Sequence, residues 1–137
     1  MQNIFLVPVD GSEQCLTAVD HAVEAALVSG YAIQLLNVQP RIHTQYAQTK
    51  VGKKTLESYK KETSDRILYQ AEARTKGRVE VVCKTRWGIP AEEICEEARG
   101  IAVKGIFLAP RKPNKKLGSV TYKVLQKSTV PVTVIPV

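Results

Sequence analysis

The sequence predicts an α/β fold: a five-stranded, parallel, open sheet, doubly wound, with helices on both faces. Short apolar runs alternate with longer stretches of helical periodicity along all 137 residues, as strand then helix four times and then a last strand. The runs at residues 3–9 and 105–109 are almost continuously apolar, which is typical of strands covered on both faces. Right-handed crossovers between such strands place helices on both sides of the sheet.

The first part of the chain gives clear element boundaries. The apolar run NIFLVPV at residues 3–9 stops at Asp10-Gly11-Ser12, which is a turn signal and a good helix N-cap. A helix is predicted from Glu13 to Ser29, and Gly30 ends it. Its apolar face is expected to consist of Leu16, Val19, Val23, Ala26 and Leu27. The second strand is AIQLLNV, residues 32–38, and residues 40–52 form a long polar connection.

A long polar helix is predicted next, over about residues 52–75, and Gly77 follows its end. Its weak apolar face is Leu56, Tyr59, Ile67 and Ala71. Pro90 opens a third helix as its first residue, and Glu92 and Glu93 suit the positive end of that helix, so they are interpreted as stabilising it and not as a catalytic pair. The remaining elements are strands at 79–85, 105–109 and 130–137 and a helix at 118–128.

Composition and charge exclude several classes of protein. The chain is 44% hydrophobic and 24% charged, which fits one globular domain spanning residues 1–137. It contains no apolar run of about 18 residues and no signal peptide at its start, so we expect no membrane span and a cytoplasmic location. We expect its three cysteines to be buried and reduced. The net charge of +7 comes without a nucleic-acid motif, so nucleic acid is not the favoured partner.

A ligand site is expected at the carboxyl ends of the strands. Doubly wound sheets bind ligands there, at the point where the strand order reverses. The segments that follow strands, and that would therefore meet at this edge, are residues 8–12, 37–46, 86–90 and 109–120. The histidines have no visible nucleophile or carboxylate partner at triad-like spacing, no metal cluster is apparent, and so no catalytic constellation is predicted.

With these motifs in place, the chain resembles the universal stress protein family over nearly its full length. The matching pieces are VPVDGSEQCLTAVDHAVEAA near the start, LLNV in the second strand, WGIPAEEICEEAR at the third helix, and LGSVTYKVLQKSTVPVTVIPV at the end. The resemblance implies a sheet of order 3-2-1-4-5 and a homodimer. In one branch of the family it also implies ATP bound across the switch point of the sheet.

The resemblance also implies which residues would hold a nucleotide. The end of the first strand, Pro8, Val9 and Asp10, would contact the base and ribose, and the backbone of Val38 would contact adenine. The phosphates would lie on a motif G-x-x-G, nine residues, then Gly-Ser or Gly-Thr, whose end matches Gly118 and Ser119, followed by Val120.

The phosphate motif is degenerate in this chain. Its start reads Ala109-Pro110-Arg111-Lys112, and only five residues, PNKKL, separate Lys112 from Gly118. Both leading glycines are missing, and Pro110 and Pro113 cannot donate a backbone N–H. The sequence therefore excludes a conventional triphosphate cradle. Gly118 and Ser119 still open a helix whose amino end favours an anion, and Lys112 and its neighbouring cations could attract one by charge.

Three functions remain open at this point. The first is a dimeric regulatory or binding module that does not hold ATP tightly, without a tightly bound cofactor. The second is an ATP-binding protein with slow hydrolysis that uses the lysine-rich loop, with ATP, another nucleotide or another anion as its ligand. The third is a basic surface for a polyanion. The last strand, residues 130–137, carries no charge and would lie at the sheet edge, so we expect a homodimer that pairs around Val132–Ile135.

Overall fold

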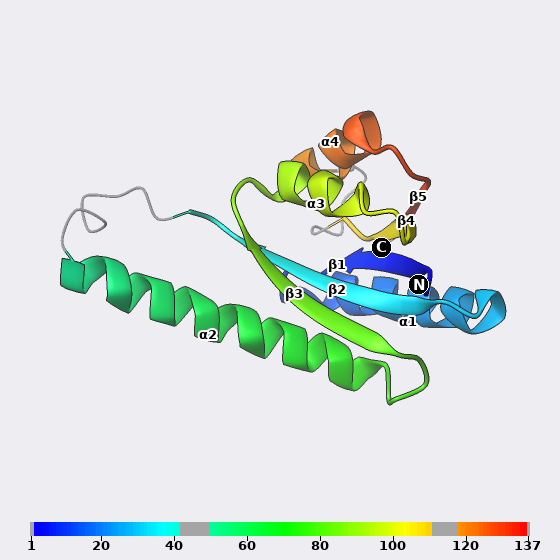
Figure 1. Ribbon diagram of the computed structural model, residues 1–137, viewed down its shortest axis with the longest axis horizontal. Coiled ribbons are helices and arrows are strands. Elements are labelled where there is room, and N and C mark those ends of the chain that lie inside the picture. Colours follow the sequence, from blue (N-terminus) through cyan, green and yellow to red (C-terminus); the bar gives the residue numbers. More distant parts are fainter. Residues whose placement is uncertain (1, 42–49, 111–117, 137) are drawn as a thin grey trace.

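Five parallel strands form one sheet in the order β3-β2-β1-β4-β5, which confirms the predicted architecture (Figure 1). The computed structural model describes residues 2–41, 50–110 and 118–136, with side chains from residue 55 onward in the helix that begins at residue 50. The strands are β1 (Ile4–Pro8), β2 (Ala32–Gln39), β3 (Val81–Trp87), β4 (Val103–Leu108) and β5 (Val132–Val134). The helices are α1 (Glu13–Ser29), α2 (Lys50–Arg74), α3 (Pro90–Ala98) and α4 (Ser119–Lys127).

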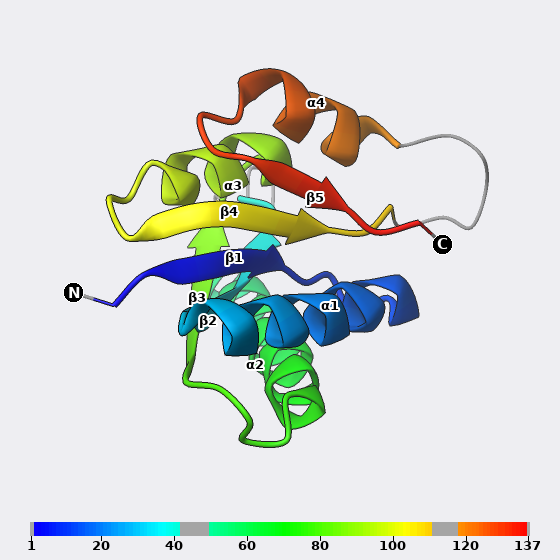
Figure 2. The same cartoon turned by 90° about the vertical axis from the view of Figure 1, so that its right-hand side faces the viewer.

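Helices cover both faces of the sheet because successive residues of the central strands point to opposite sides. In β1, Val7 packs in an apolar cluster with α1 and α2, whereas the preceding Leu6 packs in a second cluster with α3 and α4. Both side chains are fully buried. Figure 2 shows α1 and α2 on one side of the strands and α3 and α4 on the other. β1 is therefore the centre of a doubly wound core.

Helix α1 has the predicted bounds. The Ser12 side chain accepts a hydrogen bond from the backbone N–H of Cys15 at 3.4 Å, and the N–H of Gly30 donates to the carbonyl of Ala26. The buried face consists of Cys15, Ala18, Val19, Ala22, Val23 and Ala26. The prediction that Leu27 belongs to this face was wrong, since Leu27 is 44% exposed. Ala18, Ala22 and Ala26 lie along the buried face of α1, and this places Leu27 at the edge of that face.

Two strand boundaries differ from the prediction. β3 runs from Val81 to Trp87 instead of 79–85, because its ladder to β2 begins at Ile33 and continues as far as Gln39. β5 covers Val132–Val134 instead of 130–137, because Pro131 and Pro136 flank it and proline cannot donate to a ladder. β4 begins two residues earlier than predicted, at Val103.

Two predictions of burial were also wrong. Cys83 is exposed because it lies on the edge strand β3, whereas Cys15 and Cys95 are buried as expected. Tyr59 is exposed on α2, whose buried positions among the described side chains are Ser64, Leu68 and Ala71.

None of the helices in the described parts of the chain has the length and apolar character of a membrane span.

Candidate nucleotide site and a groove beside β3

The ends of β1 and β2 are joined by a buried polar link. The backbone N–H of Val9 donates to the carbonyl of Leu36 at 2.8 Å, and the Asn37 side-chain amide donates to the carbonyl of Val9 at 2.8 Å. Gln39 donates in turn to the Asn37 side-chain oxygen at 2.8 Å. Asn37 is only 2% exposed, so these bonds satisfy polar groups that would otherwise be costly to bury. This link holds Pro8, Val9 and Asp10 beside the end of β2.

Val38 lies in β2 beyond the last residue that pairs with β1, so its backbone N–H and carbonyl have no partner residue of β1 beside them. The pairing of β1 and β2 ends at Pro8 with Leu36, and the carbonyl of Leu36 faces β1 because it accepts from Val9. Backbone direction alternates along a strand, so the N–H and carbonyl of Val38 point to the same side as those of Leu36. The predicted base-contacting residues therefore come together at one place on the carboxyl edge.

Asp10 forms the turn that leads into α1. One carboxylate oxygen of Asp10 accepts a hydrogen bond from the backbone N–H of Ser12 at 2.9 Å. Gly11 lies between them with a φ of +88°, and an added Cβ would lie 3.3 Å from Ile67 of α2. Only glycine fits this conformation and this close approach without strain. Asp10 is exposed at the carboxyl edge, where its carboxylate shapes the turn into α1.

The other half of the predicted site is the start of α4. Gly118 is the N-cap, with a φ of +83° and no side-chain cap bond, and its carbonyl accepts from the N–H of Tyr122 at 3.1 Å. Ser119 is the first helical residue, and it is exposed together with Gly118 and Val120. Lys112 lies outside the described residues, as does the rest of segment 111–117. Figure 2 shows the amino ends of α1 and α4 on the side to which β1, β4 and β5 point.

A half-buried ion network joins the last part of β3 to α3. Arg86 donates to Glu93 at 2.8 Å and to Glu97 at 2.7 Å, and Glu97 also pairs with Lys84 at 2.9 Å. Gln34 donates to the second oxygen of Glu97 at 2.9 Å. Burial alone would raise the pKa of Glu97, but the hydrogen bonds from Lys84, Gln34 and Arg86 hold that pKa below its usual value. The network fastens the edge strand β3 to α3.

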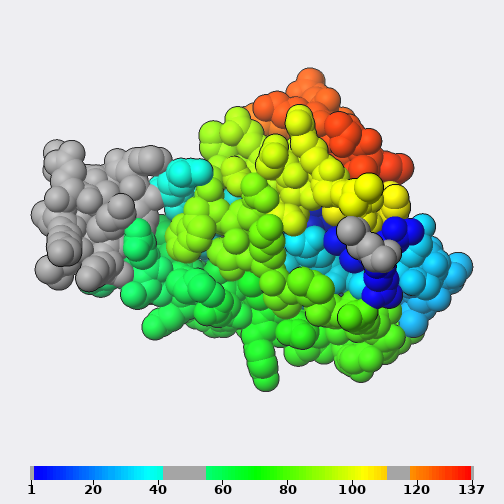
Figure 3. Space-filling view, viewed as in Figure 1, coloured from blue at the N-terminus to red at the C-terminus, as the bar shows by residue number. Residues whose placement is uncertain are grey.

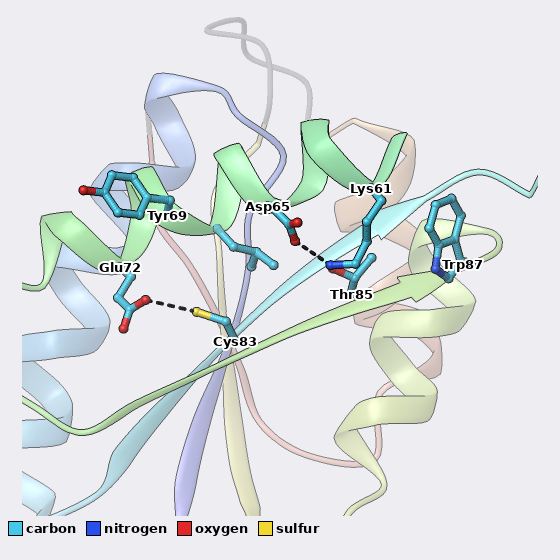
Figure 4. A pocket seen from close by; sticks show the side chains of 8 residues that line it. Lys61, Asp65, Tyr69, Glu72, Cys83, Thr85 and Trp87 are labelled. Carbon is cyan, nitrogen blue, oxygen red and sulfur yellow. Dashed lines mark hydrogen bonds and ion pairs between the residues drawn. The ribbon is translucent and has the colours of Figure 1, made fainter. Parts of the chain in front are cut away.

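A groove that the sequence did not predict lies between α2 and β3 (Figure 4). It has a volume of about 480 Å³ and is lined by Lys61, Asp65, Leu68, Tyr69, Glu72, Cys83, Thr85 and Trp87. Lys61 and Asp65 form an ion pair at 2.6 Å, and the thiol of Cys83 lies 3.7 Å from a carboxylate oxygen of Glu72. Desolvation and the Glu72 carboxylate raise the pKa of Cys83 to about 11, so the thiol is protonated at neutral pH.

In the described parts of the chain, no group of three or more His, Cys, Asp and Glu side chains is arranged to hold a metal ion. The carboxyl edge of the sheet brings the step between β1 and β2 together with the amino ends of α1 and α4. This is the usual position of a ligand site in such sheets.

The family of the protein follows from comparison with known proteins. A model of the universal stress protein family matches residues 1–136, and the chain belongs to that family. A search of curated protein sequences found no match.

Several solved structures share the fold. The universal stress protein UspA from Lactobacillus plantarum is 22% identical with a TM-score of 0.79, and the match covers 98% of this chain and 97% of that chain. The universal stress protein from Archaeoglobus fulgidus, solved in complex with dAMP, is 20% identical with a TM-score of 0.73 and covers 98% of both chains. A family member from Arabidopsis thaliana, solved with AMP bound, is 18% identical with a TM-score of 0.69 and covers 98% of this chain and 91% of that one.

Proposed function

We propose that the protein is a dimeric regulatory or binding module of the universal stress protein family, with a degenerate nucleotide site that does not hold ATP tightly. The proposal places it in the cytosol as a single domain, which agrees with its three unpaired cysteines. Two solved relatives carry dAMP and AMP, which supports an adenine nucleotide as the kind of ligand this edge accommodates. The question is then how much of that site this chain retains.

The base side of the site is retained in this proposal. The link through Val9, Asn37 and Gln39 fixes the step between β1 and β2, and Val38 directs its backbone toward that step. Asp10 lies in the turn before α1, on the same edge of the sheet. These groups suit a base and a ribose, which need a few fixed polar partners and a shallow apolar floor.

The phosphate side carries the proposal. Ala109 stands where the family motif has its first glycine, and the buried Pro110 that follows it has no N–H to donate. A triphosphate needs several backbone N–H groups in close approach. In the described residues, the amino end of α4 at Gly118 and Ser119 is what remains to bind an anion, which suits weak binding of one phosphate better than a triphosphate.

Isothermal titration with Mg-ATP tests the proposal. We expect no dissociation constant tighter than roughly 100 μM, which is about −5.5 kcal/mol. The Ser119→Ala variant, titrated alongside, reports whether any binding uses the start of α4. A low-micromolar constant that Ser119→Ala abolishes would overturn the proposal and support the second candidate, an ATP-binding protein with slow hydrolysis.

The proposed dimer uses the open edge of β5. The carbonyl of Pro131 accepts from Ile106, and the N–H of Ile135 donates to Leu108, so alternate residues of this segment face β4. Val132 and Val134 lie between them and direct their backbone groups to the open edge. Antiparallel pairing of two copies around these residues would satisfy both edges at once.

Sedimentation equilibrium tests the dimer. We expect about twice the chain mass of 15.2 kDa at tens of micromolar protein. A single species at the mass of one chain under those conditions would contradict this part of the proposal.

A further inference from the structure

The edge strand β3 and the groove beside it form a surface that the candidate nucleotide site does not use. β3 ends the sheet on the side opposite β5, and it has seven residues where β5 has three. In contrast with the flanks of β5, β3 contains no proline. Figure 3 shows β3, in light green, at the surface of the molecule above α2. A long, regular edge of this kind is a template for another strand.

The backbone of β3 shows which groups this edge offers. The N–H of Ile33 donates to the carbonyl of Glu80, and the N–H of Gly88 donates to the carbonyl of Gln39, each at 2.9 Å. Even-numbered residues of β3 therefore bond to β2. Because backbone direction alternates, the N–H and carbonyl groups of the odd-numbered residues point to the open edge. These residues are Val81, Cys83, Thr85 and Trp87.

Three of these four residues also line the groove. The side chains of Cys83, Thr85 and Trp87 face α2 and form one wall of the 480 Å³ groove (Figure 4). The hydroxyls of Thr85 and the buried Ser64 lie 2.7 Å apart and join strand to helix, and Leu68 adds an apolar surface. A strand added to β3 would therefore place every second side chain over this groove, while its backbone bonds to the open edge.

Charge selects the chemistry of the added strand. Lys61 is already paired with Asp65, but among the described residues Glu72 has no cationic partner, only the thiol of Cys83. The cations of β3, Lys84 and Arg86, turn to the other face of the sheet and pair with Glu97 of α3. Desolvation, together with the Glu72 carboxylate, raises the pKa of Cys83. The groove thus presents one uncompensated carboxylate.

We propose that this surface binds an extended peptide segment of a partner protein, added as a sixth strand along β3, with a Lys or Arg side chain that pairs with Glu72. Backbone bonding along the open edge supplies affinity without regard to sequence. The carboxylate and the groove select a cation flanked by apolar residues at alternate positions.

A designed peptide pair tests this proposal. The probe is acetyl-Thr-Val-Thr-Lys-Thr-Val-Thr-amide, and its matched control has Glu in place of Lys. We expect the Lys peptide to bind at least about tenfold more tightly in calorimetry, since the control places two carboxylates together. We also expect the Lys peptide to slow the alkylation of Cys83 by N-ethylmaleimide, while the buried Cys15 and Cys95 serve as internal controls. Equal affinity for both peptides, or no protection of Cys83 at millimolar peptide, would overturn the proposal.

Protein variants separate the backbone from the charge. Glu72→Gln should weaken binding of the Lys peptide by roughly threefold to fivefold, the range of an exposed ion pair. Cys83→Pro removes an N–H that faces the open edge, which edge strands tolerate, and should weaken binding more than about tenfold. Cys83→Ala keeps that N–H and should bind normally. If Cys83→Pro instead converts a dimer to a monomer in sedimentation, a second copy occupies the edge and the proposal is wrong.

Discussion

Replacing Glu97 by Gln should destabilise the protein more than any other exchange of one carboxylate for an amide in α3. Glu97 accepts hydrogen bonds from Gln34, Arg86 and Lys84, and its side chain is only 13% exposed. A neutral amide has one acceptor oxygen instead of two, and its NH₂ group would face donors. Arg86 keeps its bond to Glu93 at 2.8 Å, and the half-exposed Lys84 can turn to water, so part of the network survives.

The expected loss is about 2 kcal/mol, in the range for a hydrogen bond to a charged, mostly buried group. For a chain of this length, that corresponds to a fall in Tm of about 7 °C. Glu96→Gln is the matched control, because Glu96 lies on the same helix, is 60% exposed, and is 3.9 Å from Arg99. Its effect should stay below about 0.5 kcal/mol.

The pH dependence gives an independent check on the cause. The pKa of Glu97 is lowered in the folded protein from 4.5, so its contribution is fully present above that value and is lost as the pH falls through the folded pKa. The difference in unfolding free energy between wild type and Glu97→Gln should therefore shrink as the pH falls below about 4.5. Equal effects of the two variants in urea denaturation, or a gap that persists in strong acid, would refute the reasoning.

Two further predictions concern an edge and a helix contact. Val134→Lys should weaken the proposed dimer at least tenfold, since it places two like charges at a symmetric strand pair. Val82→Lys on the opposite edge should leave sedimentation unchanged, and identical behaviour of the two variants would exclude β5 as the interface. The hydrogen bonds from Arg74, at 2.8 and 2.7 Å, hold the pKa of Asp20 below its usual value. Asp20→Asn should therefore lower Tm by less than about 3 °C near neutral pH. It should not lower Tm once the pH is below the folded pKa of Asp20. A double-mutant cycle with Arg74→Ala that gives no coupling would contradict this assignment.

Local signals in the sequence were enough to predict the fold, and they placed Pro8–Asp10 and Val38 at the carboxyl edge of the sheet. Helix α1 was predicted with its observed bounds because a side chain caps its start and a glycine ends it. The step at Pro8–Asp10 followed from the end of an apolar run. β3 was placed two residues early because an edge strand has no strong apolar pattern, and its true limits come from pairing with β2.

What the sequence could not give depends on pairs that meet only in the fold. Asn37 looked like an ordinary polar residue in a strand, and its role appears only when Val9 lies beside it. Glu93 was interpreted through the helix dipole alone, yet it binds Arg86 on the neighbouring strand. The alternation of Lys84 and Arg86 was a usable signal, because it places two cations on one face of β3. The groove had no such signal, since its two walls come from separate elements, α2 and β3.

The two open edges of the sheet are built differently, and they should act independently. β5 is short and flanked by prolines, which limits pairing to the few groups at Val132 and Val134 and suits a symmetric contact between copies. β3 is longer, and its cations turn away to α3, which leaves a regular edge beside an acidic groove.

Three strands separate the two edges, so at an inter-strand spacing of about 4.8 Å the edges are about 19 Å apart. Effects at that distance without shared partners usually add. A protein carrying both Val134→Lys and Cys83→Pro should therefore lose dimerisation and peptide binding by the same factors as the single variants. If the loss of dimerisation or the loss of peptide binding in the double variant differs from that in the corresponding single variant, the sheet couples its two edges.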